Sequence, residues 1–90
     1  MTYYQTTKKD IDKRSAQILH SIKRARERYG LELSIADIES IAQLIRAQKT
    51  RRVKDVSNTR VIHELDFNGI TVLVVYDKKR HTLNTFLPKD

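Results

Sequence analysis

The sequence predicts an α+β domain in which two helices precede a four-stranded antiparallel β-meander packed on them, in the order ααββββ. Apolar residues recur every three or four positions up to about residue 48 and every second position after residue 50. The 90 residues fit one domain. We expect a flexible tail over 1–6, a helical hairpin over 7–48 and an antiparallel sheet over 50–88.

The first helix is predicted from about Lys8 to Tyr29. Thr7 can cap its start, with Asp10 three residues later to reciprocate. Gly30 follows the helix, where a C-cap favours a positive φ. The stripe expected to face the core consists of Ile11, Ser15, Ile18, Ile22, Ala25 and Tyr29, and Leu19 widens it.

The second helix has a clear start signal, because Ser34 is followed by Asp37 at the third helical position. Leu33 and Ile38 are placed to form a hydrophobic staple across this cap. The apolar face expected of this helix consists of Ile35, Ile38, Ile41, Ala42, Leu44 and Ile45. The loop between the two helices is short, which favours a helical hairpin.

Strands are predicted over 52–56, 59–67, 70–77 and 82–87. Asn68-Gly69 is the strongest hairpin signal and fixes Phe67 opposite Ile70. The face expected to receive the helices carries Val61, His63, Leu65, Phe67, Ile70, Val72, Val74 and Tyr76, with Leu83, Thr85 and Leu87 beyond the next turn. The other face is mixed and carries an apolar patch of Ile62, Leu73, Val75 and Phe86, which suggests a groove or a partner surface.

The composition favours a polyanionic partner. Eighteen Lys and Arg against eleven Asp and Glu give a net charge of +7 and a pI near 9.9. The absence of cysteine excludes disulfides, zinc-thiolate sites and Cys nucleophiles. No apolar run approaches the ~20 residues of a membrane span, and the first nine residues lack the apolar segment of a signal peptide. We therefore expect a cytoplasmic protein that does not contact a membrane.

A run of cations at the helix-to-strand junction is the strongest binding signal. It consists of Arg46, Lys49, Arg51, Arg52 and Lys54, with no acidic residue among them. The turn Lys78-Lys79-Arg80 could extend it across the end of the sheet, as could Arg60. Such a track would hold phosphates with an affinity that falls steeply with salt. The alternative is a solvated basic edge that only blocks strand aggregation.

Three stretches resemble a known group of small RNases. They are HSIKRARERYGLELS over 20–34, the strand pair formed by Arg60-Val61-Ile62 with TVLVVYD over 71–77, and LNTFLP over 83–88. They are similar to the barnase–EndoU–colicin–RelE group, which includes RNase toxins and RelE-type mRNA interferases. The sequence departs from RelE relatives in lacking their leading strand, a catalytic Glu before the Arg strand and a terminal aromatic residue.

The resemblance implies a metal-independent endoribonuclease that needs no cofactor, with RNA as substrate and an antitoxin, an immunity protein or a host defence complex as a possible protein partner. It implies that Arg60 holds the scissile phosphate, that His20 transfers the proton, and that Tyr76 and Thr85 orient the ribose or phosphate. In the expected register Arg60 lies on the opposite sheet face from Tyr76 and Thr85, so the four residues could meet only at an end of the sheet.

The histidines can also be weighed by chemistry, because metal-independent RNA cleavage needs a group that moves protons near neutral pH. His63 is expected to face the core, and a satisfied core histidine is its favoured role. His81 lies in a basic turn, where it could be merely solvated. His20 lies opposite the apolar stripe, in a setting that suits either catalysis or a plain surface residue.

Two other classes of function remain open. One is a non-enzymatic basic inhibitor, such as a phage-type anti-defence protein that binds nucleic acid or an acidic protein surface. The other is a structural module that forms a homodimer through the mixed sheet face. The small size and the basic charge fit the inhibitor.

Overall fold

The computed structural model describes residues 8–88 and, within them, the side chains from residue 13 onward. The elements are α1 (Lys8–Tyr29), α2 (Ile35–Arg46), β1 (Arg51–Asp55), β2 (Arg60–Phe67), β3 (Ile70–Asp77) and β4 (Thr82–Leu87). The predicted α+β class and the order ααββββ are confirmed, with each strand within one residue of its expected bounds. The predicted tail over 1–6 and the Thr7 cap lie outside the described residues.

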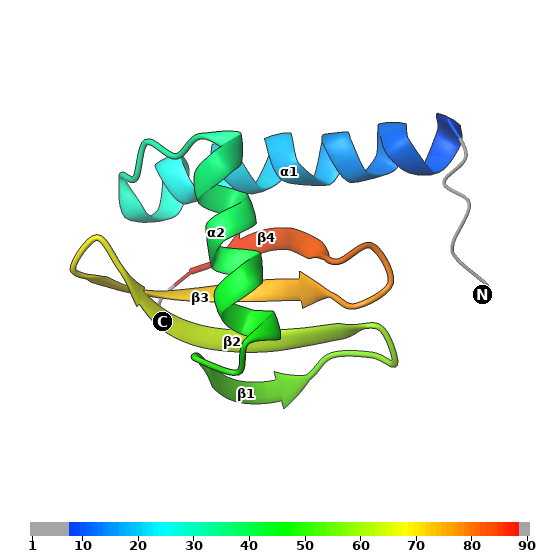
Figure 1. The fold of residues 1–90 in the computed structure, drawn as a ribbon. Helices are drawn as coiled ribbons and strands as arrows, with labels where there is room; N and C mark the ends of the chain where they lie inside the picture. Colours follow the sequence, from blue (N-terminus) through cyan, green and yellow to red (C-terminus); the bar gives the residue numbers. More distant parts are fainter. Residues whose placement is uncertain (1–7, 89–90) are drawn as a thin grey trace.

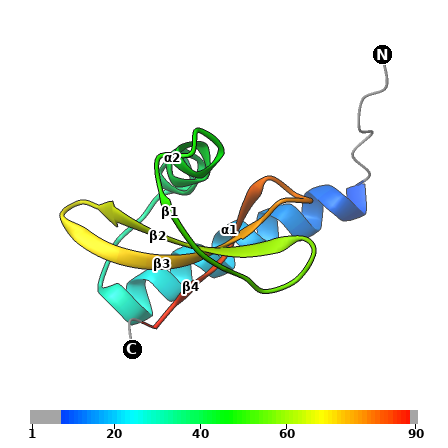
Figure 2. The ribbon, with the colours of Figure 1, turned by 90° about the horizontal axis from the view of Figure 1, so that it is seen from below.

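The four strands form one antiparallel sheet in the order β1-β2-β3-β4. The two helices take different places on it. α1 runs along the edge strand β4, whereas α2 crosses one face of the sheet at a steep angle to the strands (Figure 1). The view from below shows α2 standing clear on that single side of the sheet (Figure 2). We call the side covered by α2 the core face.

The stripe predicted for α1 is right at Ile18 and Ala25, which are buried, and wrong at Ser15 and Leu19. Ser15 is exposed, and the Leu19 side chain is 60% exposed. Ser21 is fully buried instead, and its hydroxyl donates to the backbone carbonyl one turn earlier (2.9 Å). Because α1 lies along a single edge strand, only a narrow stripe of the helix is covered.

The start of α2 follows the prediction. The Ser34 hydroxyl accepts from the Asp37 amide (3.2 Å) and the Asp37 carboxylate accepts from the Ser34 amide (2.9 Å), which is a capping box. Gly30 has a φ of +68° at the end of α1, as its place after the helix predicted. Ile35 was wrongly included in the buried face, since its side chain is 56% exposed. It is the first residue of α2.

The register between β2 and β3 matches the prediction at every position, from Phe67 opposite Ile70 to Val61 opposite Tyr76. The strand β1 pairs with β2 with a shift between Arg52 and Lys54, so one extra residue, Val53, is inserted. Such a bulge changes which side chains of a strand share a face.

A second register shift changes the predicted faces of β4. Leu83 pairs with Tyr76, but Thr85 pairs with Val75, so Asn84 is the extra residue. The assignment of Thr85 and Leu87 to the core face was therefore wrong, and Phe86 lies on that face instead. Phe86 is fully buried, and its ring packs edge-on against Tyr29 with 6.2 Å between ring centroids. The aromatic ring fills the core where the regular register would have placed Thr85.

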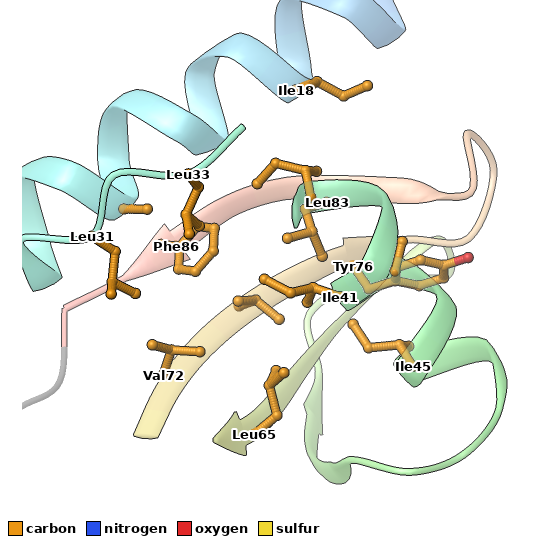
Figure 3. Close-up of a cluster of buried hydrophobic side chains, with 14 residues drawn as sticks. Ile18, Leu31, Leu33, Ile41, Ile45, Leu65, Val72, Tyr76, Leu83 and Phe86 are labelled. Carbon is orange, nitrogen blue, oxygen red and sulfur yellow. The ribbon is translucent and has the colours of Figure 1, made fainter. Parts of the chain in front are cut away.

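The hydrophobic core lies between α2, α1 and the core face of the sheet (Figure 3). Its labelled members are Ile18, Leu31, Leu33, Ile41, Ile45, Leu65, Val72, Tyr76, Leu83 and Phe86. The Tyr76 ring lies beside Ile45 with its hydroxyl at the outer margin of the cluster. One aromatic side chain thus belongs to the core and presents a polar atom at its edge.

Candidate nucleic-acid interface

The structure does not bring together the four predicted catalytic residues. His20 is exposed on α1. Tyr76 lies on the core face, while Arg60 pairs with Asp77 and Thr85 with Val75, so Arg60 and Thr85 lie on the opposite face. The bulge at Asn84 moves Thr85 away from Tyr76 and onto the side of Arg60, contrary to the expected register.

A different set of residues surrounds a hollow of about 250 Å³ where the end of α2 meets β1, β2 and β3. We call this hollow the basic pocket. It is lined by Ile45, Arg46, Gln48, Arg52, Val61, His63, Tyr76 and Lys78. Three of these side chains are cationic, none is acidic, and the histidine and the tyrosine supply the groups that can exchange protons.

The β-bulge in β1 places Arg52 in one wall of the basic pocket. Arg52 pairs with His63 and Asp55 pairs with Val61, and both partners lie on the core face. In a regular strand, residues three apart would point to opposite faces. The extra residue Val53 therefore places Arg52 and Asp55 on the same side, where the Arg52 guanidinium donates to the Asp55 carboxylate.

His63 lies on the core face, as predicted, and is hydrogen-bonded as a satisfied core histidine would be, but it is only half-buried and lines the basic pocket. Its Nδ1 is hydrogen-bonded to Thr50 Oγ1 (2.9 Å), and its ring lies edge-on to Tyr76 with 6.4 Å between centroids. Burial lowers the pKa of His63, and the positive charge of Arg52 lowers it further. The lowered pKa favours the neutral imidazole at neutral pH. No described residue is hydrogen-bonded to Nε2.

The cations of the basic pocket come from three different segments. Arg46, the last residue of α2, donates to the carbonyl of His81 (3.1 Å) and to the Tyr76 hydroxyl (3.4 Å). Lys78 follows β3, and its backbone amide donates to the carbonyl of Thr59 (2.7 Å). The Arg46 and Lys78 residues are exposed, so the pocket offers positive charge to a ligand that arrives from solvent.

The remaining members of the predicted basic track are divided by the sheet. Arg51 pairs with Glu64 and Lys54 with Ile62, so both lie on the face opposite the basic pocket. Arg51 also forms an ion pair with the Glu64 carboxylate (3.4 Å). Lys49, beyond α2, and Lys79, in the β3–β4 turn, are exposed. The cations that are clustered in the sequence therefore do not form one continuous surface in the structure.

The β3–β4 turn is fixed by Asp77, whose side chain is 1% exposed. One carboxylate oxygen accepts from the backbone amides of Lys79 (2.9 Å) and Arg80 (3.3 Å), and the other from Gln17 (3.1 Å) and the Arg80 guanidinium (3.3 Å). Burial alone would raise the pKa of Asp77, but these hydrogen bonds outweigh it and hold the pKa below its ordinary value. A charged Asp77 thereby ties α1 to the turn that carries Lys78.

Sequence reasoning missed the basic pocket as a unit, although part of the signal was present. The predicted register already placed His63 and Tyr76 on one face of adjacent strands. What it lacked was the pairing of β1 with β2 and the bulge that turns Arg52 toward them. Neither follows from the alternation of apolar residues, because every residue of β1 is exposed.

Among the described residues, no group of three His, Asp or Glu side chains is arranged to hold a metal ion. No helix within residues 8–88 is long and apolar enough to cross a membrane. Comparison of the chain with protein-family models, with curated proteins and with solved structures found no significant match.

Proposed function

We propose that this protein binds RNA in the cytoplasm through the basic pocket and cleaves it there without a metal ion. The observation that supports the proposal is the half-buried imidazole of His63, which has a lowered pKa. It lines the same hollow as the cations Arg46, Arg52 and Lys78. A neutral imidazole can accept a proton, and three cations can stabilise a phosphate in the transition state. The resemblance to small RNases agrees with this chemistry.

In the proposed reaction, His63 Nε2 takes the proton of a ribose 2′-hydroxyl, with the tautomer fixed when Nδ1–H donates to Thr50 Oγ1. The 2′ oxygen attacks the adjacent phosphorus, and the bond from phosphorus to the 5′ oxygen breaks. The Tyr76 hydroxyl gives its proton to the leaving 5′ oxygen and recovers one through solvent from the protonated His63. The products are a 2′,3′-cyclic phosphate and a 5′-hydroxyl.

Arg46 and Arg52 have distinct tasks in this scheme. Arg46 donates to the Tyr76 hydroxyl and so holds this proton donor at the margin of the pocket. The planar guanidinium of Arg52 can make two charge-assisted bonds to the phosphate oxygens when it exchanges its exposed ion pair with Asp55 for the phosphate. Of the catalytic residues implied by resemblance, this scheme retains Tyr76. It assigns the proton transfer to His63, because His20 and Thr85 do not line the basic pocket.

The test is a cleavage assay on a mixed-sequence RNA in the presence of a chelator. We expect His63→Gln to lower the rate ~100-fold or more, since a general base typically contributes that much. The matched control is His20→Ala, which removes an exposed histidine from α1 and should leave the rate unchanged. If His63→Gln cleaved as fast as the wild type and His20→Ala did not, the result would support the catalytic role of His20 implied by resemblance.

The pH profile supplies an independent readout. His63 must be unprotonated to act as a base, and its pKa lies below the ordinary value of 6.5. The rate should therefore be constant around neutral pH and fall only as the pH drops through that lowered value. A profile whose acidic limb lies above pH 6.5 would contradict the assignment of His63 as the base.

A second candidate is a non-enzymatic basic inhibitor, such as a phage-type anti-defence protein. It is favoured by one observation, the separation of His20, Arg60, Tyr76 and Thr85. On this alternative the wild type binds RNA or an acidic protein surface, and the bound RNA stays intact through a long incubation. A protein partner such as an antitoxin or immunity protein belongs to the enzymatic candidate and is detected by co-purification.

A further inference from the structure

We propose that a second hollow, on the opposite face at the same end of the sheet, binds another phosphate of the same RNA strand. We call it the turn hollow. It measures about 330 Å³ and is lined by Lys13, Ala16, Gln17, Arg60, Arg80 and Asn84. The inference rests on the proposed RNA binding and adds that the ligand is a single strand several nucleotides long.

Three parts of the fold meet at the turn hollow. One side of α1 contributes three lining residues, which are separated by three or four positions from the first and so lie close together on the helix: Lys13, Ala16 and Gln17. Arg60 begins β2 and pairs with Asp77, which places it on the face away from α2. The bulge at Asn84 brings its side chain to α1, where the Gln17 amide donates to Asn84 Oδ1 (2.9 Å).

The charge around the turn hollow suits an anion. Its lining includes the cations Lys13, Arg60 and Arg80 and no carboxylate. The Asp77 carboxylate, which is hydrogen-bonded to the lining residues Gln17 and Arg80, is buried, and Arg80 donates to both of its oxygens. Arg80 is thus neutralised by Asp77, and Lys13 and Arg60 supply the remaining charge, since neither forms an ion pair with a described residue.

The hydrogen-bonding groups at this hollow match a nucleotide rather than a bare ion. Gln17 Oε1 and Arg80 Nε are buried, and neither has a hydrogen-bond partner among the described residues. Buried polar atoms are nearly always paired, and a rotation of either side chain toward the hollow would let a ligand supply the missing partner. Gln17 Oε1 requires a donor, which an exocyclic amino group of a base provides, and Arg80 Nε requires an acceptor, which a phosphate oxygen provides.

The two hollows share one turn. Lys78 lines the basic pocket and Arg80 lines the turn hollow, two residues further along the chain. The Lys78 amide donates to the carbonyl of Thr59, next to Arg60, which fixes the turn against the start of β2. An RNA strand that leaves the basic pocket at Lys78 therefore passes over the end of the sheet and reaches Arg60 and Arg80.

The experiment measures the affinity of 2′-O-methyl oligonucleotides, which cannot be cleaved, at lengths of ~2 and ~8 nucleotides over a series of salt concentrations. We expect Arg60→Ala to weaken binding of the longer oligonucleotide and to reduce its salt slope by about 0.7, the value for one phosphate contact on a single strand. Binding of the dinucleotide should be unchanged. The matched control is Lys79→Ala, which removes an exposed cation of the same turn that lines neither hollow.

The outcomes distinguish failure of the second subsite from failure of RNA binding as a whole. The turn hollow is not a second subsite if Arg60→Ala and Lys79→Ala have the same affinity for both oligonucleotides. The same conclusion follows if Arg60→Ala weakens binding of both lengths equally. Arg52→Ala, in the basic pocket, should weaken both lengths, and that result would uphold the proposed RNA binding even if the turn hollow fails. A wild type that binds neither oligonucleotide would overturn the proposed function and this inference together.

Discussion

Asp77 is the residue whose replacement tests the fold most directly, because its side chain is 1% exposed and accepts four hydrogen bonds. Asp77→Ala removes all four and leaves the Arg80 guanidinium, which is only 19% exposed, without its counter-ion. The change also frees Gln17 from β3, although Gln17 keeps its hydrogen bond to Asn84. The turn and the contact of α1 with it should both loosen.

The size of the effect follows from the kind of pair that is broken. Removing one partner of a buried ion pair costs about 3–5 kcal/mol, and the partial exposure of Arg80 favours the lower end. At 0.05–0.15 kcal/mol per residue, a domain of this length has a stability of about 5–13 kcal/mol. A loss of about 3 kcal/mol should lower the melting temperature by about 12–24 °C.

Urea unfolding at two pH values gives the assay. The folded pKa of Asp77 lies below its unfolded value, so its charge stabilises the protein above about pH 4, and this stabilisation is lost as the pH falls through the folded pKa. The stability difference between wild type and Asp77→Asn should be full at pH 7 and shrink below about pH 4. A difference that is the same at both pH values would refute the argument that the ionised carboxylate is what stabilises the turn.

The chain contains a matched control in Asp55, which also pairs with an arginine three residues away and also has a lowered pKa, caused mainly by the hydrogen bond from Arg52. This pair is exposed, and exposed ion pairs contribute little to stability. Asp55→Ala should therefore leave the unfolding midpoint unchanged. If Asp55→Ala and Asp77→Ala were equally destabilising, burial would not be the reason for the effect of Asp77.

Three further predictions concern the core, the helix start and the basic pocket. Leu65→Asp places an unpaired charge in the core and should abolish cooperative thermal unfolding, since such changes cost several kcal/mol; a retained cooperative melt would show that the face assignment is inverted. Ser34→Ala removes the capping box and should cost ~1 kcal/mol in urea unfolding, whereas no change would mean that the cap does not stabilise α2. Arg52→Ala should weaken RNA binding more than Lys54→Ala, which removes the same charge from the opposite face, and equal effects in a salt titration would argue against the basic pocket as the phosphate site.

The fold was predictable because local signals agreed with one another. The capping box at Ser34 fixed the start of α2, and the Asn68-Gly69 turn fixed the register of β2 and β3. The two are short-range features, in which the residue types themselves determine the local backbone geometry. Where such a signal was present, the prediction was right to within a residue.

The candidate site was less predictable because two bulges decide which side chains face it. At Asn84 the sequence permits either face for the residues that follow, since Thr85 and Phe86 both suit a strand. The choice is made by packing, because the Phe86 ring fills a core position between Tyr29 and the sheet. At Val53 no buried side chain exists to reveal the choice, since all of β1 is exposed. Packing between segments distant in the sequence set the outcome at Asn84, and the pairing of β1 with β2 set it at Val53. Neither is recorded in the local alternation of apolar residues.

The bulge at Val53 also bears on how the protein can change during evolution. Losing or gaining one residue in β1 would move Arg52 or Asp55 to the other side of the sheet and so remove one wall of the basic pocket. The same event would leave the hydrophobic core intact, because β1 contributes no buried side chain to it. A one-codon insertion or deletion at this edge could thus switch the pocket off, or restore it, in a protein that folds throughout.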